Sequence, residues 1–211
     1  MSLKDIDISK VTYFDLNNEI NIPINGQIQL GKDKEALEAF LNENVKPNTK
    51  QFSSIKERIN YLIQNNYYEE EFISKYSFEF IEKLYDYLKK EDFHFKTFMA
   101  AYKFYAQYAL KTDDNAYYLE NFIDRVATNA LYFGDGDEKL ALELADELIH
   151  QRYQPATPSF LNAGRKRRGE LVSCFLIQMT DDMNSIGRNI NSALQLSRIG
   201  GGVGINLSNL R

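Results

Sequence analysis

Apolar residues recur at helical spacing through the middle of the chain, from Ser53 to Ile149. They fall three or four positions apart, as they do on the buried face of an α-helix. Short polar links, such as residues 134–137, separate the periodic segments. We therefore predict an antiparallel assembly of about five or six helices. After a first helix that carries Ile55, Ile59 and Leu62, the predicted helices run from Tyr67 to Tyr76, Phe78 to Lys90, Phe98 to Leu110, Tyr117 to Phe133 and Glu138 to Tyr153.

The segment before this helical region has a different pattern. Residues 11–30 are predicted to form two short strands around Asn25-Gly26, a dipeptide that strongly favours a hairpin turn. Asp33 is then expected to cap a helix that runs from Lys34 to about Asn42. Lys46-Pro47-Asn48 should end that helix, because proline interrupts the backbone hydrogen bonds.

After Pro155-Ala156-Thr157-Pro158 the segments become shorter and of mixed type, starting with a turn at residues 162–164. The pattern then predicts a strand from Leu171 to Met179, a helix from Met183 to about Ser197 and a strand from Val203 to Leu207. This α/β pattern reaches Arg211 without completing a sheet, and alone it would leave exposed strand edges and a half-covered apolar face. We expect either a truncated chain or a partner that supplies the rest.

Tyrosine and phenylalanine side chains form stripes along the predicted helices. Such stripes could serve as stacking platforms for nucleic-acid bases. They have the spacing of a helical core and lie in an acidic region, which favours core packing and argues against nucleic acid as a partner. The glutamate run at residues 69–71 is interpreted as a solvated face.

The composition narrows the class of protein. The hydrophobic and charged fractions of the 211 residues are ordinary for a soluble globular protein. No apolar run is long enough to cross a membrane, and residues 1–10 lack the apolar core of a signal peptide. The single cysteine excludes an internal disulfide and fits a reducing cytosol, so we expect a cytoplasmic protein. One cysteine and the distant His94 and His150 leave no zinc-type cluster, and no metal site is expected.

Charge and glycine are both concentrated toward the C-terminus. Residues 164–211 contain seven Lys and Arg against three Asp and Glu, whereas the whole chain has a net charge of −5. Seven of the eleven glycines lie between Gly164 and Gly204. The run Arg165-Lys166-Arg167-Arg168 could bind nucleic acid, but no aromatic residue interleaves with it. A loop that binds phosphates or a partner surface fits the run better.

Three further features leave alternatives open. Gly200-Gly201-Gly202-Val203-Gly204 follows a helix and precedes a strand, the opposite order to a dinucleotide-binding loop, so it permits either close ligand approach or a tight helix end. Asp181-Asp182 could cap the next helix or accept a ribose hydroxyl. Thr157 and Ser159, beside Pro158, could donate to an anion or form a turn.

The single cysteine, Cys174, lies in the strand predicted from Leu171 to Met179 and directly follows Ser173. A thiol beside a hydroxyl and downstream of a cationic loop could carry out redox chemistry on a phosphorylated substrate. It could equally be an inert thiol of the core, because free cysteine is among the most often buried residues.

Residues 153–177 resemble the large (α) subunit of class Ib ribonucleotide reductase. The likeness continues through residues 185–188, 192–197 and 200–211, and upstream through residues 16–20, 67–72, 104–105 and 108–112. It implies a mainly α N-terminal helical domain followed by the first β/α elements of an incomplete ten-stranded α/β barrel. Residues 1–50 would be a short region where other class I enzymes carry an ATP cone, residues 51–153 the helical domain, and residues 154–211 the start of the barrel.

The resemblance also assigns roles to individual residues. Cys174 would be the reducing cysteine, which supplies a hydrogen to the 2′ carbon of a ribonucleoside diphosphate and ends as half of a disulfide. The substrate would also contact Thr157, Ser173 and the backbone of Gly201 and Gly202. A deoxynucleoside triphosphate or ATP would bind as allosteric effector at Asp181 and Arg211.

The implied partners follow from the chemistry of the family. The reaction needs a second cysteine to close the disulfide, a third to carry a radical, and a cysteine pair for re-reduction. Cys174 is the only cysteine here, so we expect the chain alone to be inactive. It would need the C-terminal remainder of the α subunit, a β subunit with a metal-radical cofactor, and a glutaredoxin-like or thioredoxin-like reductant, while binding no cofactor itself. The alternative is a non-catalytic regulatory or binding module.

Overall fold

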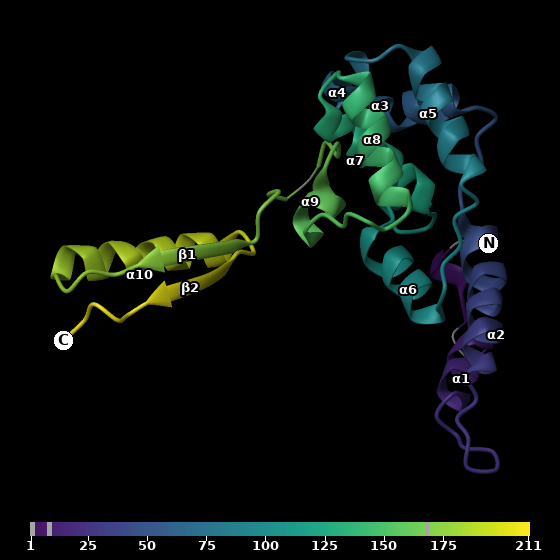
Figure 1. Cartoon of the computed structure of the whole chain (residues 1–211), viewed down its shortest axis with the longest axis horizontal. Coiled ribbons are helices and arrows are strands. Elements are labelled where there is room, and N and C mark those ends of the chain that lie inside the picture. Colours follow the sequence, from purple (N-terminus) through teal and green to yellow (C-terminus); the bar gives the residue numbers. More distant parts are fainter. Residues whose placement is uncertain (1–2, 8–9, 168) are drawn as a thin grey trace.

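The computed structural model describes residues 3–7, 10–167 and 169–211. Figure 1 shows a body of packed helices from which a separate arm extends. The body contains α1 (Tyr13–Glu19), α2 (Gly31–Phe40), α3 (Ile55–Gln64), α4 (Glu70–Ser74), α5 (Phe78–Lys90), α6 (Phe98–Lys103), α7 (Phe122–Gly134), α8 (Glu138–Ile149) and α9 (Thr157–Asn162). The arm contains β1 (Cys174–Gln178), α10 (Met183–Arg198) and β2 (Gly202–Asn206).

Short polar side chains set the starts of the main helices. Ser54, Ser77 and Thr97 each accept a hydrogen bond from a backbone N–H in the first turn of α3, α5 and α6, respectively. Asn121 and Asp124 form a reciprocal capping box at the start of α7. The helical prediction for residues 53–149 is confirmed, and α5 has the predicted bounds.

The aromatic side chains form the core of the body, as predicted. The Phe40 and Phe98 rings meet edge to face with centroids 5.7 Å apart, and Phe93 stacks on Phe122 at 4.1 Å. The core is continuous from α1 and α2 through α5, α7 and α8. Glu70 and Glu71 are exposed, in agreement with the interpretation of that run as a solvated face.

The two strands predicted within residues 11–30 are wrong, because residues 13–19 form the helix α1. Tyr13 and Phe14 face the Phe98 ring from consecutive positions, with centroids 5.9 and 6.3 Å away, and this aromatic packing overrides the local preference for strand. The turn itself is confirmed, since Asn25 and Gly26 have φ of 51° and 79°.

The cap predicted at Asp33 is also wrong. Helix α2 starts at Gly31, which places Asp33 in its first turn, and the Asp33 carboxylate instead accepts the backbone N–H of Phe98 at 3.3 Å. Asp33 therefore holds the start of α6 against α2. The helical path continues through a π turn (Leu41–Val45) and ends, as predicted, in a 3₁₀ turn (Lys46–Asn48).

Several helix boundaries differ from the prediction, since α4 is shorter than residues 67–76 and α8 ends at Ile149 rather than Tyr153. Residues 117–121 are extended, because the N–H of Tyr118 donates to the carbonyl of Asn48 and that of Leu119 donates to the carbonyl of Leu110, both at 2.8 Å. Helix α7 therefore starts only after Asn121. Helix α9 was not predicted, although proline in a first helical turn is favourable, as Pro158 is here. The remaining short elements are a 3₁₀ turn (Leu3–Asp5) and a π turn (Phe104–Tyr108).

The arm is a β–α–β unit in which β1 and β2 pair in parallel. Cys174 lies opposite Gly202 and Gln178 opposite Asn206. Side chains alternate along β1, so Phe175 and Ile177 are half-buried while Cys174, Leu176 and Gln178 are exposed. The predicted strand–helix–strand order is confirmed. Within the described residues no helix is long and apolar enough to cross a membrane.

Candidate functional site

A pocket of about 220 Å³ lies where the arm meets the body, and it is lined by residues of α9, the entry to β1 and the turn after α10. Three residues predicted to contact substrate share this pocket: Thr157, Ser173 and Gly201. The other lining residues are Pro158, Leu161, Asn162, Gly169, Glu170, Val172, Phe175, Ile199 and Gly200. Three segments, within residues 157–162, 169–175 and 199–201, thus supply the lining of the pocket.

Side chains of α9 hold the entry to β1. The hydroxyl of Ser159 donates to the carbonyl of Leu171 at 3.0 Å, and the amide of Asn162 donates to the carbonyl of Glu170 at 2.8 Å. Ser159 thus contacts a backbone carbonyl twelve residues away, which is neither the anion nor the turn left open for it. These bonds hold α9 and the entry to β1 together on one side of the pocket.

Cys174 lies next to this pocket but does not line it. Alternation along β1 turns Ser173 toward the pocket and Cys174 toward the uncovered face of the sheet, with 3.9 Å between Ser173 Oγ and Cys174 Sγ. The thiol is exposed in the part of the chain that the structure describes, and its role stays a prediction. Gly202 is the cross-strand neighbour of Cys174, and the absence of a side chain there leaves the backbone beside the thiol open.

Asp181 and Arg211, the two predicted effector residues, form an ion pair of 3.0 Å. They lie toward the end of the arm that points away from the body, where the C-terminus is found (Figure 1). Their neighbour Asp182 accepts the N–H of Ser185 at 2.8 Å and so caps α10, which decides the alternative left open for that residue. Effector and substrate candidates therefore occupy separate ends of the same unit.

Comparison with known proteins covers nearly the whole chain. The family description "Ribonucleotide reductase N-terminal" matches residues 13–93, "Ribonucleotide reductase, all-alpha domain" matches residues 94–168, and "Ribonucleotide reductase, barrel domain" matches residues 172–211. The chain belongs to the ribonucleotide reductase large-subunit family.

Two relatives of this chain are α subunits of ribonucleoside-diphosphate reductases. The chain is 50% identical over 199 residues to the ribonucleoside-diphosphate reductase subunit alpha of Bacillus subtilis (strain 168). The matched region covers 94% of this chain and 28% of that protein. The chain is 52% identical over 179 residues to the subunit alpha of Mycoplasma genitalium, covering 85% of this chain and 25% of that protein. The chain thus spans about a quarter of the length of these relatives and matches their N-terminal family regions.

The glycines that line the pocket have different structural roles. Gly200 follows the end of α10 with a φ of 91°, so this glycine serves to end the helix. A Cβ on Gly201 would lie 2.6 Å from Cε2 of Phe175 and 2.9 Å from the carbonyl oxygen of Leu196. Gly201 therefore allows the turn to pack against the Phe175 ring, a structural reason for glycine in the wall of the pocket.

Replacing Gly201 with alanine is expected to destabilise the arm by about 1–3 kcal/mol, because the added methyl group must displace a ring and a backbone carbonyl. Hydrogen exchange of the amides of residues 174–178 measures the opening of β1 directly. The matched control is Gly187→Ala in α10, whose Cβ would meet no atom within 4 Å and should raise helix stability by up to about 1 kcal/mol. Equal protection of β1 in both variants would contradict the assigned role of Gly201.

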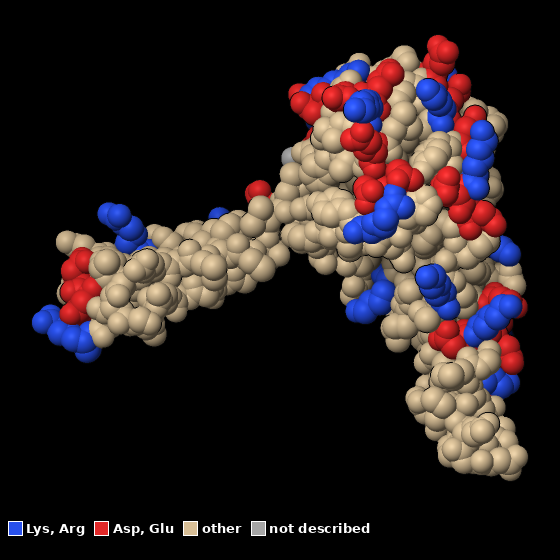
Figure 2. Space-filling model, in the orientation of Figure 1, with Lys and Arg blue, Asp and Glu red and all other residues tan. Residues whose placement is uncertain are grey.

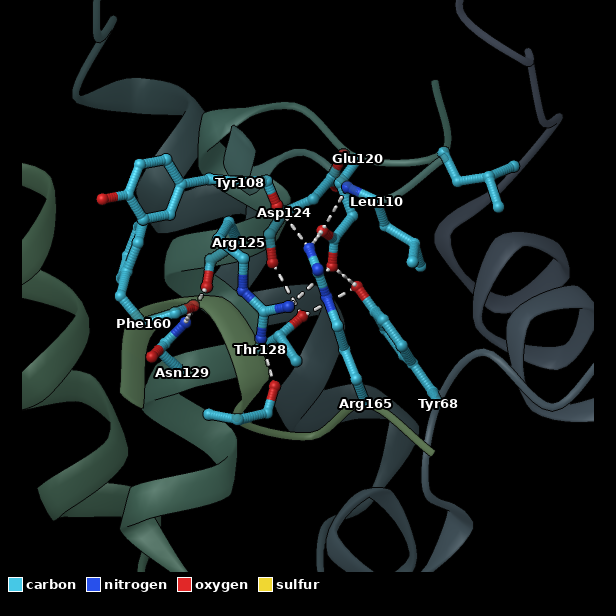
Figure 3. A network of polar contacts seen from close by, with 12 residues as sticks. Tyr68, Tyr108, Leu110, Glu120, Asp124, Arg125, Thr128, Asn129, Phe160 and Arg165 are labelled. Atoms are coloured by element: carbon cyan, nitrogen blue, oxygen red, sulfur yellow. Dashed lines mark hydrogen bonds and ion pairs between the residues drawn. The ribbon is translucent and has the colours of Figure 1, made fainter. Parts of the chain in front are cut away.

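The prediction that the cationic run binds anions fails at Arg165. Its side chain is buried and donates to the carboxylate of Glu120 at 2.6 Å and to the carbonyl of Tyr108 (Figure 3). Arg167 pairs with Asp113 at 2.8 Å, and Arg168 lies outside the described residues. On the face shown in Figure 2, charged side chains cover the body and gather again at the far end of the arm.

Glu120 lies at the centre of a buried ionic network that sequence reasoning missed. It is fully buried between Arg125 at 3.1 Å and Arg165 at 2.6 Å, and it accepts the hydroxyl of Tyr68 at 2.6 Å (Figure 3). Burial alone raises the pKa of this carboxyl, but the two guanidinium groups and the hydroxyl outweigh burial and lower the pKa to about 2. The available signal was Arg125, which sits on the apolar face of α7 between Phe122 and Asn129.

This network also holds the wall of the pocket. The guanidinium of Arg125 donates to the carbonyl of Ala163, and the amide of Asn129 donates to the carbonyl of Phe160 at 3.2 Å. Both acceptors are backbone groups of α9 or of the turn that follows it. Charged groups in the core thus fix the short helix that carries Thr157.

Proposed function

We propose that this chain forms the N-terminal part of a class Ib ribonucleotide reductase α subunit that reduces ribonucleoside diphosphates to deoxyribonucleoside diphosphates. The observation that carries the proposal is the pocket shared by Thr157, Ser173 and Gly201, with Cys174 on the adjoining strand opposite Gly202. Thr157 and Ser173 supply hydroxyl groups that bind the substrate, and the backbone of Gly201 and Gly202 supplies the surface against which it lies.

The chemistry assigned to Cys174 requires a second thiol. Two thiols together give two electrons and two hydrogens, the 2′ hydroxyl leaves as water, and the thiols are left joined as a disulfide. Cys174 is the only cysteine of this chain, so the second thiol and the radical-carrying thiol come from the remainder of the α subunit. A β subunit with its metal-radical cofactor starts the reaction, and a thioredoxin-like or glutaredoxin-like protein restores the thiols.

The arm supports the requirement for further chain. Parallel sheets are normally covered on both faces, yet Leu176 on the uncovered face is 92% exposed. In the part of the chain that the structure describes, β1 and β2 pair only with each other, so both outer edges are open. Further strands of the α subunit would cover this face and extend the pair toward the ten-stranded barrel of the family.

The proposed effector site rests on Asp181 and Arg211. A cation suits the phosphates of a deoxynucleoside triphosphate or ATP, and a carboxylate suits a ribose hydroxyl. Their ion pair is exposed on the Arg211 side, so little free energy opposes its opening when an effector binds.

The test combines this chain with a second chain that supplies the remainder of the α subunit and with the β subunit. We expect formation of deoxynucleoside diphosphate from the mixture and none from any component alone. A stable complex that binds nucleotide but yields no product would instead identify the chain as a regulatory or binding module. Formation of product by this chain and β subunit alone would overturn the assigned requirement for a second thiol.

A further inference from the structure

Tyr108 connects the body of the protein to the candidate substrate pocket. It is the last residue of the π turn Phe104–Tyr108, and its hydroxyl lies 3.0 Å from the hydroxyl oxygen of Thr157. Among the described residues, Tyr108 is the hydrogen-bonding partner of the Thr157 hydroxyl. Thr157 lines the pocket, whereas Tyr108 is not one of its lining residues.

The body holds Tyr108 at two places and the nearby Leu110 at a third. Its ring packs against Phe160 with centroids 5.7 Å apart, and its carbonyl accepts the guanidinium of Arg165. The N–H of Leu110, two residues on, donates to Glu120 at 2.9 Å. Tyr108 is therefore anchored to the buried network and places its hydroxyl at a fixed point relative to α9.

The direction of the hydrogen bond follows from the ligand. A hydroxyl group has one hydrogen to donate and two lone pairs that accept. The oxygens of a diphosphate only accept, so a Thr157 hydroxyl that binds them in the proposed site donates its one hydrogen to the substrate. The bond to Tyr108 then requires Tyr108 to donate and Thr157 to accept, which directs the Thr157 hydrogen away from Tyr108 and into the pocket.

We propose that Tyr108 is a positioning residue, which orients the Thr157 hydroxyl as a donor to the diphosphate group of the substrate. This inference rests on the proposed function of the pocket. It assigns no contact between Tyr108 and the substrate, so its effect is transmitted through Thr157 alone.

The test uses Tyr108→Phe, which keeps the ring on Phe160 and removes only the hydroxyl. In the reconstituted reductase we expect KM for cytidine diphosphate, and its Kd by equilibrium dialysis, to rise about three- to tenfold while kcat changes less than about twofold. Thr157→Val should raise both constants at least as much, and Thr157→Ser should restore most of the loss. In the Thr157→Val background, Tyr108→Phe should have no further effect.

The matched control is Tyr87→Phe. Tyr87 also donates its hydroxyl within the body, to Asp146, but it has no contact with the pocket. This variant should leave KM and Kd unchanged, and thermal unfolding of all variants separates a loss of fold from a loss of orientation.

The outcomes separate the inference from the proposed function. Additive effects of Tyr108→Phe and Thr157→Val, or a wild-type Kd in Tyr108→Phe, would overturn the role of Tyr108 while leaving the proposed function intact. Coupled effects on Kd without any turnover would support Tyr108 and overturn the proposed reduction. Absence of cytidine diphosphate binding by the wild-type assembly would overturn both.

Discussion

Replacing Glu120 with glutamine is expected to lower the free energy of unfolding by about 3–5 kcal/mol, because it leaves two buried guanidinium groups without their shared carboxylate. Glu120 and Arg125 are fully buried, and the Arg165 side chain is 10% exposed. Glutamine preserves the shape of the side chain but can neutralise neither cation. Urea denaturation at neutral pH measures the loss, which is a large part of the stability of an ordinary domain.

The same carboxylate predicts how stability depends on pH. The pKa of Glu120 falls from 4.5 to about 2 on folding, so its contribution is present in full above about pH 4.5 and is lost as pH falls toward 2. The shift corresponds to about 3 kcal/mol. The nearby Asp124 changes stability with pH in the opposite direction to Glu120. Burial raises the pKa of Asp124 on folding, even though its ion pair with Arg58 lowers that pKa. The difference between wild type and Glu120→Gln isolates Glu120, and it should shrink between pH 4.5 and pH 2.

Glu147→Gln is the matched control for Glu120→Gln. Glu147 also pairs with an arginine, Arg152 at 3.1 Å, but its side chain is 46% exposed. Exposed ion pairs contribute little, so this variant should lose less than about 1 kcal/mol. Equal losses in the two variants, or a Glu120→Gln variant as stable as wild type, would show that the buried network does not stabilise the body.

The parts of the fold that follow from local pattern could be predicted from the sequence. Helix α5 carries apolar residues at regular spacing, starts after Ser77 and ends in two lysines, so periodicity and capping agree. The arm was predicted for a similar reason, since glycines and Asp182 mark the ends of its helix. The start of α7 could also have been found, because Asn121 and Asp124 have the spacing of a capping box.

Other parts depend on contacts that are distant in the sequence. Helix α1 is stabilised by the Phe98 ring, more than eighty residues away, and the extended segment before α7 likewise depends on backbone bonds to distant residues. The cationic run is the clearest case, because nothing local shows that Arg165 is buried against Glu120. Charge counted along a sequence cannot distinguish a solvated cation from one that is paired in the core.

The candidate site likewise could be predicted from the sequence only in part. The resemblance named Thr157, Ser173 and Gly201 together, and the structure places them around one pocket, while their roles toward substrate stay predictions. Tyr108 was absent from that set, because its link to Thr157 spans 49 residues and joins a π turn to a short helix. Cys174 was expected beside the Ser173 hydroxyl, and the structure places the two side chains 3.9 Å apart at Sγ and Oγ, while the alternation along β1 leaves the thiol exposed.

Replacing Cys174 with serine is expected to reduce deoxynucleoside diphosphate formation in the reconstituted reductase by at least about three orders of magnitude. A serine hydroxyl cannot form the disulfide whose formation supplies the two electrons that reduce the substrate, so no turnover is possible. The side chain is exposed, and the substitution should change the free energy of unfolding by less than about 0.5 kcal/mol. Product formation per active site, measured with and without the protein reductant, checks the first expectation.

Ser173→Ala is the matched control, because it alters the adjacent residue and leaves the thiol in place. It should weaken binding of the substrate through the lost hydroxyl but retain turnover, whereas Cys174→Ser should retain binding and lose turnover. The uncovered position of Cys174 adds a second check, since its thiol should react readily with iodoacetamide in this chain alone and slowly once the remainder of the α subunit covers the sheet. Turnover of Cys174→Ser within tenfold of wild type would remove Cys174 from the reaction, whatever the rate of its alkylation.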